Sequence, residues 1–201
     1  DNLLGYYKEG ERFYKQDFTF SRSTTGTYTD SEGYIQEMPY NLLQQSNQFD
    51  TTWNTSSAAT VIGGQADKDG GTSAWKLEAI SASTAFARQF INISSSIATF
   101  SFYAKAGTTN WTYVNCIGIV AFFNLSNGTV GYKSSDIIDA SITSVGGGWY
   151  RVSITGTGMT EQRIYTAPRN NNSVSAVGDN IYIQNAQLVK GTSAKTYFPT
   201  T

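Results

Sequence analysis

The 201-residue sequence contains no histidine and only one cysteine. Without histidine, the chain lacks the commonest general base, the Ser–His and Cys–His nucleophile systems and the favoured zinc ligand. Its single cysteine, Cys116, cannot form a disulfide within the chain, and the apolar run at residues 114–117 predicts a small buried side chain there. There is also no glycine-rich phosphate loop and no dinucleotide-binding fingerprint. These absences exclude most of the common catalytic classes.

Charged side chains are also scarce. They make up 14% of the chain, and 14 basic and 15 acidic residues leave a net charge of −1. No run of lysine or arginine is dense enough to neutralise a row of phosphates, which argues against nucleic acid and anionic membranes as partners. No apolar stretch approaches the roughly 20 residues that a membrane-spanning helix needs. The sequence therefore predicts a soluble protein that binds neither nucleic acid nor membrane.

Aromatic residues, by contrast, make up 14% of the chain, and Gly, Ser, Thr and Asn are abundant. Short alternating or β-branched runs recur along the sequence, separated by Gly- and Asn-rich turn clusters. These runs lie at residues 75–79, 86–93, 100–105, 111–123, 150–154, 181–183 and 186–188. Helix signals are nearly absent, and the best window, residues 40–49, would make two turns at most. The pattern predicts an all-β fold, a jelly roll or β-sandwich of two antiparallel sheets.

Residues 1–17 are the most charged and least patterned part of the chain. We interpret them as an extended arm or connector, and residues 18–201 as one jelly-roll domain. Two short runs at residues 26–30 and 34–36 flank a Ser-Glu-Gly turn and predict a hairpin. The arm has no evident strand or helix to bury its apolar residues, which are Leu3, Leu4, Tyr6, Tyr7, Phe13 and Tyr14. Such a cluster favours an interface with another subunit, or packing of the arm across its own domain.

Paired carboxylates are the remaining catalytic option, since glycoside hydrolysis needs only two acids. The candidates are Asp67 with Asp69, Asp136 with Asp139, and Glu78, Glu161 and Asp179. Fifteen acidic residues bring some neighbours together by chance, so we expect no enzyme activity. Asp67 and Asp69 precede Gly70 as in short calcium loops, although the bidentate Glu of an EF-hand is missing. A turn is the favoured interpretation; a structural calcium ion is the alternative, and no cofactor is required.

Three groups of segments resemble a domain family found in tail-fibre and other virion proteins of bacteriophages. The second group reads FSFYAKAG, similar to the family's FSVYVKAG strand, and the third contains GWYRV, AQL and a terminal TYFPT. The first group comprises residues 20–28, Asp30, 33–35, 41–43, Ser46, Phe49 and Trp53. The second comprises residues 100–107. The third comprises residues 147–153, 181–183, 186–188, Gly191 and 194–200. The chain departs from the pattern at Gln184, where the family has Trp, and at Val189, where it has an acidic residue.

The resemblance implies a jelly roll similar to carbohydrate-binding modules and carried on a phage particle. Our leading hypothesis is a non-catalytic virion domain of a fibre, spike or capsid decoration protein that contacts host-surface glycans. Because phage fibres are commonly trimers, the resemblance also suggests a homotrimer. One alternative is a purely structural subunit whose exposed aromatic residues contact other virion proteins. Another is a carbohydrate-binding module of a polysaccharide-degrading enzyme.

Sugars present flat apolar faces ringed by hydroxyls, so their sites combine an exposed aromatic ring with amide, carboxylate or guanidinium partners. Strand alternation places Trp149 and Arg151 together on the side of their strand opposite Tyr150. They are candidates for a glycan site, with Trp149 covering the rim of the sandwich as the alternative.

Two further aromatic candidates, Trp111 and Tyr113, follow a turn at the start of a strand. For Trp111, exposure for glycan binding and packing against the domain are equally favoured. Trp53 lies in a loop rich in Asn, Thr and Ser, where we expect it to be exposed. Trp75 alternates with apolar residues, and we expect it in the core.

Overall fold

The computed structural model describes residues 6–9, 12–15, 27–29, 35–37, 40–93 and 95–201. The chain divides into two compact units, Asp1–Met38 and Pro39–Thr201. The boundary between these units follows residue 38, and the predicted boundary at residue 18 lies outside the described residues and stays a prediction.

The first unit contains two antiparallel hairpins. Strand β1 (Tyr6–Glu9) pairs with β2 (Arg12–Lys15), and β3 (Thr27–Thr29) pairs with β4 (Ile35–Glu37). The second hairpin confirms the sequence prediction. The first corrects it, because residues 1–17 were expected to contain no strand. The signal that was missed is Gly10-Glu11, since a two-residue loop that begins with glycine is typical of a tight hairpin. Leu3 and Leu4 of the predicted arm lie outside the described residues.

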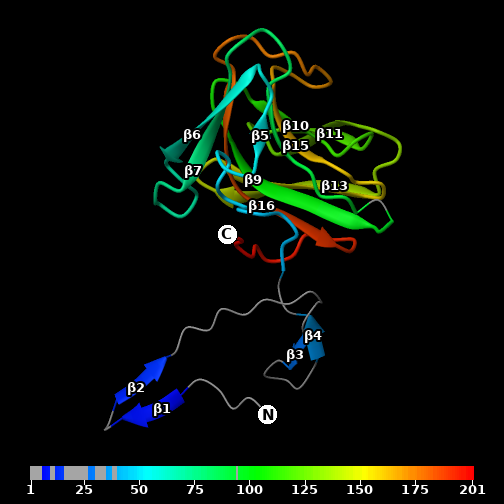
Figure 1. The fold of residues 1–201 in the computed structure, drawn as a ribbon. Coiled ribbons are helices and arrows are strands. Elements are labelled where there is room, and N and C mark those ends of the chain that lie inside the picture. Colours follow the sequence, from blue (N-terminus) through cyan, green and yellow to red (C-terminus); the bar gives the residue numbers. More distant parts are fainter. Residues whose placement is uncertain (1–5, 10–11, 16–26, 30–34, 38–39, 94) are drawn as a thin grey trace. The chain divides into compact units, whose positions relative to one another are not determined.

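The second unit is a β-sandwich of two six-stranded antiparallel sheets, as predicted (Figure 1). The first sheet has the strand order β12-β11-β10-β15-β8-β5, and the second has the order β13-β14-β9-β16-β7-β6. The first sheet comprises β5 (Asn54–Thr55), β8 (Phe86–Gln89), β10 (Trp111–Asn115), β11 (Val120–Asn124), β12 (Thr129–Lys133) and β15 (Gln162–Ala167). The second comprises β6 (Ala59–Gln65), β7 (Ala74–Ala79), β9 (Ala98–Ala106), β13 (Asp139–Gly146), β14 (Trp149–Gly156) and β16 (Asn180–Lys190).

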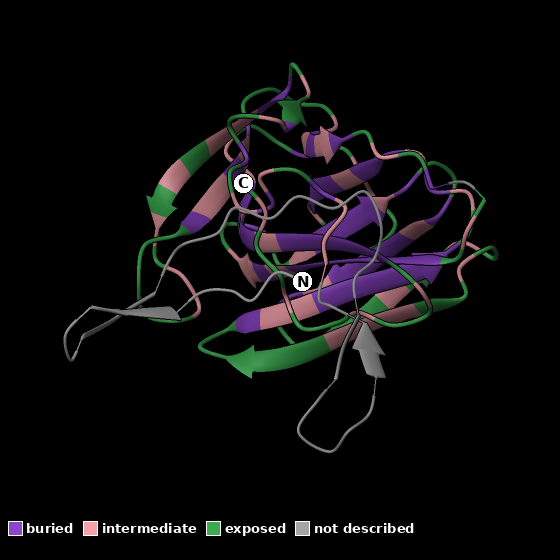
Figure 2. Cartoon of the chain, turned by 60° about the horizontal axis from the view of Figure 1, so that its bottom comes forward, coloured by how far each residue is buried: buried purple, intermediate pink, exposed green. Residues whose placement is uncertain are grey.

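One hydrophobic core fills the space between the two sheets. Alternate residues of each strand point into it, such as Phe100 and Phe102 of β9, Phe123 of β11, and Val152 and Ile154 of β14. Cys116 is among these fully buried side chains, as the sequence predicts. Figure 2 shows the buried residues running along the strands, while exposed residues gather in loops and at sheet margins. The remaining side chains of each strand therefore face outward, on one of two opposite sides of the sandwich.

The apolar run at residues 111–123 forms two strands, not one. Ile117 and Gly118 have φ angles of 57° and 85°, and the backbone N–H of Cys116 donates to the carbonyl of Ile119 at 3.0 Å. Positive φ values are incompatible with an extended strand, so the chain reverses here and β10 pairs with β11. This reversal matters because it places the aromatic side chains of the run directly opposite one another.

Residues 40–49 form turns rather than a helix, and the only regular elements among the described residues are β-strands. Its side chains instead anchor the segment to the sandwich, with Leu43 and Phe49 in the core. No helix suited to crossing a membrane occurs in the part of the chain that the structure describes.

Candidate functional site

The structure distributes the five predicted glycan-binding residues over three places. Trp53 lies in the main core, where it is 4% exposed and packs on Phe49 with ring centroids 4.7 Å apart. The prediction that Trp53 is exposed is therefore wrong, because Trp53 is buried in the same core cluster as Leu43 and Phe49. Trp111 and Tyr113 lie on the outward side of the first sheet, and Arg151 lies on the outward side of the second.

The outward side of the first sheet, which we call the aromatic face, carries five aromatic rings in one row. Neighbouring rings come from neighbouring strands, and the pairing register sets Phe122, Tyr113, Tyr165 and Phe86 directly opposite one another. Successive ring centroids are 4.6, 3.9 and 4.9 Å apart. Tyr132 of β12 completes the row with its ring 6.3 Å from that of Phe122. We call these five residues the aromatic row.

Exposure differs along the aromatic row. Tyr113, Phe122 and Tyr165 are 3–5% exposed, because they stack on one another and leave no ring face open. Tyr132, at one end, is 45% exposed. At the other end Phe86 is partly buried, and Phe90, just beyond β8, is 57% exposed. The row therefore has a packed centre and accessible rings at both ends.

Trp111 stands beside the aromatic row on the same face and is partly exposed. Its indole lies against Gly131 of β12, where a Cβ atom would come within 2.7 Å of the six-membered ring. Any larger residue at position 131 would therefore displace the Trp111 ring or the Asn170 side chain. Asn170 closes the same corner, because its side-chain oxygen accepts a hydrogen bond from the backbone N–H of Tyr132 at 2.7 Å.

A charged cluster borders the aromatic row near Phe86. The carboxylate of Glu161 accepts hydrogen bonds from Arg88 Nη1 at 2.8 Å and from Arg163 Nη2 at 2.5 Å. Both guanidinium groups lie over the ring of Phe86, at 5.6 and 5.2 Å, and Arg88 also lies 4.7 Å from the ring of Phe90. Cations over aromatic faces are attracted by the ring quadrupole, so these contacts hold the guanidinium groups in place.

Glu161 is nearly buried, with 4% of its side chain exposed. Burial raises the pKa of this carboxyl, but the hydrogen bonds from Arg163 and Arg88 outweigh that effect and lower the pKa below its ordinary value. The hydrogen bond to Glu161 likewise raises the pKa of Arg163. A general acid in glycoside hydrolysis needs a raised carboxyl pKa, so Glu161 has the opposite property. All three side chains stay charged at neutral pH.

The outward side of the second sheet, which we call the hydroxyl face, carries Arg151 amid serine and threonine side chains. A hollow of about 270 Å³ lies here. Its lining residues are Asp139, Ser141, Thr143, Arg151, Ser153, Thr155, Thr192, Ser193 and Ala194. Arg151 Nη2 donates to Gln187 Oε1 at 3.1 Å and to the carbonyl of Lys195. Trp149 is only 2% exposed, so the indole offers no open ring face beside Arg151, which favours a packing role over glycan binding.

Trp75 packs against the core, as expected, but it is only partly buried. It also lines a second hollow of about 270 Å³, together with Asn47, Gln48, Gly64, Thr72 and Ser73. The indole N–H donates to the carbonyl of Asn47 at 2.8 Å, which fixes the ring between loop and strand.

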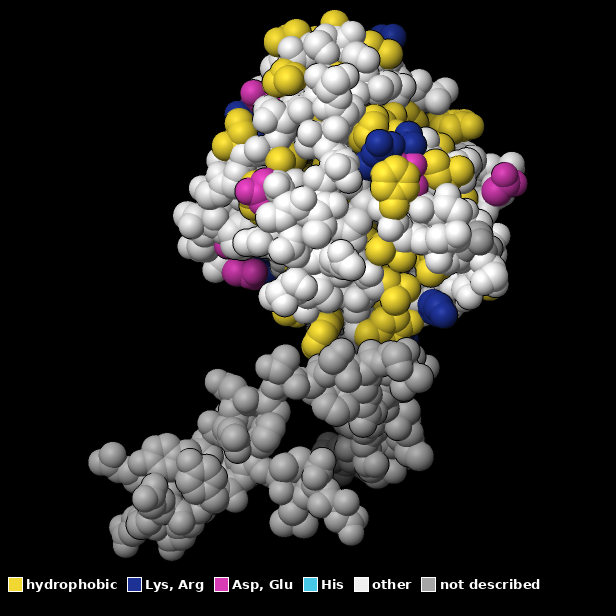
Figure 3. Space-filling view, in the orientation of Figure 1, with side chains coloured by type: hydrophobic (Ala, Val, Ile, Leu, Met, Phe, Trp, Pro, Cys, Tyr) yellow, Lys and Arg dark blue, Asp and Glu magenta, His cyan; other side chains and the backbone are white. Residues whose placement is uncertain are grey.

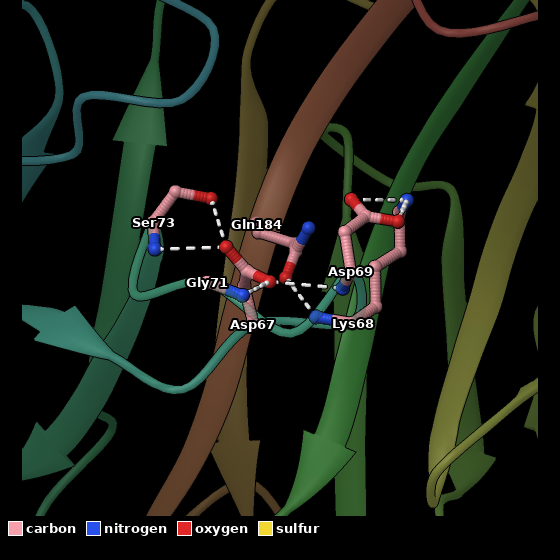
Figure 4. A network of polar contacts seen from close by, with 6 residues as sticks. All are labelled: Asp67, Lys68, Asp69, Gly71, Ser73 and Gln184. Carbon is pink, nitrogen blue, oxygen red and sulfur yellow. Dashed lines mark hydrogen bonds and ion pairs between the residues drawn. The ribbon is translucent and has the colours of Figure 1, made fainter.

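The two acids of the calcium candidate point to different partners (Figure 4). Asp67 accepts hydrogen bonds from the backbone N–H groups of Asp69, Gly71 and Ser73 and from the Ser73 hydroxyl, at 2.8–3.0 Å. These bonds, the one from the Ser73 backbone foremost, lower the pKa of Asp67. Asp69 is paired with Lys68 at 2.7 Å. No group of three or more possible metal-ligating side chains occurs among the described residues. Calcium binding stays a prediction, one that this hydrogen-bonded loop does not favour.

Sequence reasoning found two members of the aromatic face, Trp111 and Tyr113, but missed the rest. The missed residues are Phe86, Arg88, Phe122, Tyr132, Arg163 and Tyr165, while Glu161 was considered only as a possible catalytic acid. Alternation alone puts Arg163 and Tyr165 on one side of β15, and that signal was available. What alternation cannot supply is the strand order, which brings β8, β10, β11 and β15 together from distant parts of the chain.

Charge is sparse on the face shown in Figure 3. Most of that visible surface is neither charged nor hydrophobic, and the most crowded group of charges has both signs and lies among hydrophobic atoms. A site on this protein thus depends on hydroxyl, amide and aromatic groups with a few placed charges, which is the usual chemistry of sugar recognition.

No protein-family model matches the sequence, and no curated protein matches it. Solved structures similar in fold include a carbohydrate-binding module with its catalytic module from Clostridium thermocellum endo-1,4-β-D-xylanase 10B, complexed with xylohexaose (14% identity, TM-score 0.47, 81% of this chain and 30% of that chain). TmCBM61 in complex with β-1,4-galactotriose is similar over 76% of this chain and 100% of its own (10% identity, TM-score 0.43).

A third similar structure is the enzymatically active domain of tailspike protein 4 from bacteriophage CBA120 (18% identity, TM-score 0.41, 75% of this chain and 21% of that chain). This chain therefore spans less than a third of the xylanase and tailspike chains. At these values the likeness is one of broad β-sandwich fold, and no residue is carried over from it.

Proposed function

We propose that this chain is a non-catalytic glycan-binding module that holds an oligosaccharide across the aromatic face. The observation that carries the proposal is the aromatic row itself. Four rings from adjacent strands lie in register on the side of the sheet turned away from the core, and Tyr132 of the next strand extends the row across a register shift. A sheet face turned away from the core is normally polar, so an aromatic row with exposed rings at both ends favours a binding surface there.

The row suits an extended ligand. Adjacent strands lie about 4.8 Å apart, so a row across five strands is about 19 Å long, enough for several sugar residues. Tyr113, Phe122 and Tyr165 form a packed floor. Tyr132 at one end, with Phe86 and Phe90 at the other, supplies rings on which the apolar face of a sugar can stack.

Polar groups at the border of the row supply the second requirement of a sugar site. Arg88, Arg163 and Glu161 present charged donors and an acceptor beside Phe86, fixed by their mutual bonds. A rigid arrangement loses little conformational entropy when a ligand binds, which favours affinity.

The proposed setting of this module is a bacteriophage particle, where it would contact host-surface glycans as part of a fibre, spike or decoration protein. The three groups of phage-like sequence segments support that setting. A carbohydrate-binding module of a polysaccharide-degrading enzyme has the same binding chemistry. The sequence adjacent to this domain in the full protein separates the two, because a fibre carries coiled-coil or β-helical repeats and an enzyme carries a catalytic domain.

The glycan proposal is tested on a glycan array, followed by titration calorimetry with the glycans bound. Tyr132→Ala and Phe90→Ala each remove an exposed ring at one end of the row and should weaken binding at least tenfold. Phe198→Ala is the matched control, because Phe198 is 42% exposed and belongs to the carboxyl-terminal segment. The control should bind like the parent, and thermal unfolding should show all three variants folded.

Two results would overturn this assignment. Parent-like binding by both Tyr132→Ala and Phe90→Ala would remove the aromatic row as the site. Loss of binding in Arg151→Gln, on the opposite side of the sandwich, would move the site to the hollow of the hydroxyl face. If the parent binds no glycan and self-associates strongly, the structural-subunit alternative is the better account.

We also propose that identical chains assemble as a trimer through the first unit. An isolated two-stranded hairpin is at best marginally stable in water, and this unit contains two of them. The unit is also rich in apolar residues, such as Tyr7 and Tyr14, which are paired in the register of the first hairpin, and a partner subunit would supply a surface on which to bury them. Solution mass of the full chain and of a form starting at Pro39 tests this proposal. A full-length monomer at micromolar concentration would contradict it.

A further inference from the structure

A second registered row lies beside the aromatic row on the same face. Asn115 of β10 is directly opposite Arg163 of β15, and Arg163 is directly opposite Arg88 of β8. We call these three residues the polar row. Because they are each two positions from a member of the aromatic row along their strands, the two rows run parallel across the sheet.

The polar row contains hydrogen-bonding groups that the protein does not satisfy. Asn115 Oδ1, Arg163 Nε and Arg88 Nε are buried and have no hydrogen-bond partner. They make up three of the eight such side-chain atoms in the described part of the chain. Buried polar groups without partners are rare in folded proteins and each costs free energy. Three of them in one cross-strand row mark a place where the protein alone does not complete its hydrogen bonding.

The guanidinium groups also have donors to spare. Each carries five N–H donors, and the Glu161 carboxylate takes one hydrogen bond from each group. Within the part of the chain that the structure describes, the one further hydrogen bond from these groups is that of Arg163 Nη1 to the Tyr165 hydroxyl, at 3.1 Å. Their side chains remain 32% and 22% exposed, so part of each group faces solvent. Two cations against one anion leave the cluster with an excess positive charge.

We propose that the polar row binds an acidic sugar residue of the glycan, with the carboxylate of that residue on Arg88 and Arg163. This inference rests on the proposed function and names the class of glycan. The remaining N–H donors of a guanidinium fit a carboxylate in bidentate geometry, and the excess positive charge favours an anion over a neutral hydroxyl. Asn115 Oδ1 is an acceptor, and a ring hydroxyl of the same sugar residue is the donor that fits it.

Phe86 and Phe90 set the position of that sugar residue. Both guanidinium groups lie against these rings, which holds their planes on the aromatic face while their outer edges stay open. A sugar ring stacked at this end of the aromatic row thus has its carboxylate next to the cations. The described residues at the other end of the row, near Tyr132, form no such ion-paired cluster, so we expect neutral sugar residues to bind there.

The test uses matched pairs of oligosaccharides on an array and in calorimetry. Each pair is a uronate-containing oligosaccharide and its carboxyl-reduced neutral counterpart, and sulfated galactan oligosaccharides form a third arm. The acidic member should bind at least tenfold more tightly at low salt, and the difference should shrink in 0.5 M salt because the charges are partly exposed. Arg88→Gln and Arg163→Gln should each abolish the preference, and Arg151→Gln, the same change on the hydroxyl face, should keep it.

Arg88→Lys separates charge from geometry. Lysine keeps the positive charge but lacks the planar fork, so this variant should retain part of the salt-sensitive preference that Arg88→Gln loses. Thermal unfolding of each variant shows that the fold is kept.

Each other outcome has one meaning. Equal binding of acidic and carboxyl-reduced members overturns this inference and leaves the proposed function intact. Binding of the sulfated arm alone overturns the carboxylate assignment. Absence of binding in every arm and across the glycan array overturns both the inference and the proposed function.

Discussion

The two outward sides of this sandwich have opposite chemistry although they belong to sheets of equal strand number. The aromatic face places five rings across adjacent strands and borders them with Arg88, Glu161 and Arg163. The hydroxyl face pairs small polar side chains with one another: Thr99 with Thr155 and Ser141 with Ser153, each pair at 2.8 Å. The hydroxyl face thus satisfies most of its hydrogen bonds within the protein, whereas the aromatic face leaves both hydrogen-bond donors and aromatic rings open.

The carboxyl-terminal segment adds to this contrast. Gln187 Nε2 donates to the carbonyl of Thr196 at 2.9 Å, and the hydroxyls of Ser46 and Tyr197 are 2.7 Å apart. These bonds draw residues 195–200 over the hydroxyl face and cover part of it. Two unpaired atoms remain there, Arg151 Nε and Gln184 Nε2, but they lie two strands apart. On the aromatic face the unpaired atoms are in neighbouring strands, which is what a single ligand group can bridge.

The largest effect on stability should come from the centre of the aromatic row. Tyr113→Ala removes a ring that stacks between Phe122 and Tyr165 and is 5% exposed. We expect a loss of about 4 kcal/mol in the free energy of unfolding, measured by urea denaturation. A loss below about 1 kcal/mol would mean that the row does not pack as a unit, and the contrast between the faces would be broken.

We expect a smaller loss in the free energy of unfolding when the charged cluster of Arg88, Glu161 and Arg163 is broken. Glu161→Gln keeps the shape of the side chain but leaves two guanidinium groups without their anion. A fully buried pair broken in this way costs roughly 3–5 kcal/mol, and partial exposure of Arg88 and Arg163 should reduce the cost to about 2 kcal/mol. Urea denaturation at pH 7 measures it, and Glu78→Gln, which breaks the more exposed pair with Lys76, serves as the control. Equal losses in the free energy of unfolding for Glu161→Gln and Glu78→Gln would show that the charged cluster stabilises the protein no more than an exposed ion pair does.

Acid should remove the same contribution of Glu161 to the free energy of unfolding. The pKa of Glu161 is lowered in the folded protein, so the unfolded state binds a proton first as the pH falls. The stabilisation by ionised Glu161 is therefore fully present above its ordinary pKa of 4.5 and is lost as the pH falls through the lower folded-state value. The difference in stability between the parent and Glu161→Gln should shrink steadily below pH 4.5. A difference that stays constant down to pH 2 would show that charge is not its cause.

The smallest effect should come from the hydroxyl face. Ser153→Ala breaks the hydrogen bond with Ser141 and leaves one hydroxyl to be satisfied by solvent, at a cost of about 1 kcal/mol. Because this change lies on the side away from the aromatic row, glycan affinity should stay within twofold of the parent. Calorimetry checks the affinity, and a tenfold loss would show that the hydroxyl face takes part in binding.

Much of this fold could be predicted from the sequence, because each strand carries its own alternation and each turn its own Gly or Asn. The hairpin of β3 and β4 and the boundaries of β7 and β14 follow from such local patterns. The reversal at Ile117 could not be predicted as readily, since a β-branched residue seldom takes a positive φ. The hairpin of β1 and β2 was missed because charged residues obscured its alternation.

The candidate site was harder to predict than the fold. Trp111 and Tyr113 stood out because large aromatic residues follow a turn, and both belong to the aromatic face. Trp53 was an equally strong candidate because its neighbours in the sequence are polar, but the side chain is buried in the core. Its burial depends on contacts with Leu43 and Phe49, which the polar composition of the loop does not reveal. Arg88, Glu161 and Arg163 come together only through the order of strands, which local patterns leave undetermined.

The indole N–H groups of the four tryptophans offer the most direct measurement. Trp111 lies on the aromatic face, Trp149 on the side of Arg151, Trp53 in the core and Trp75 beside the second hollow. Two-dimensional ¹⁵N–¹H spectra recorded while an array-identified glycan is added follow all four signals at once. The account predicts that the Trp111 signal shifts progressively while that of Trp149 stays in place. A titration in which Trp149 or Trp75 shifts and Trp111 does not would contradict it.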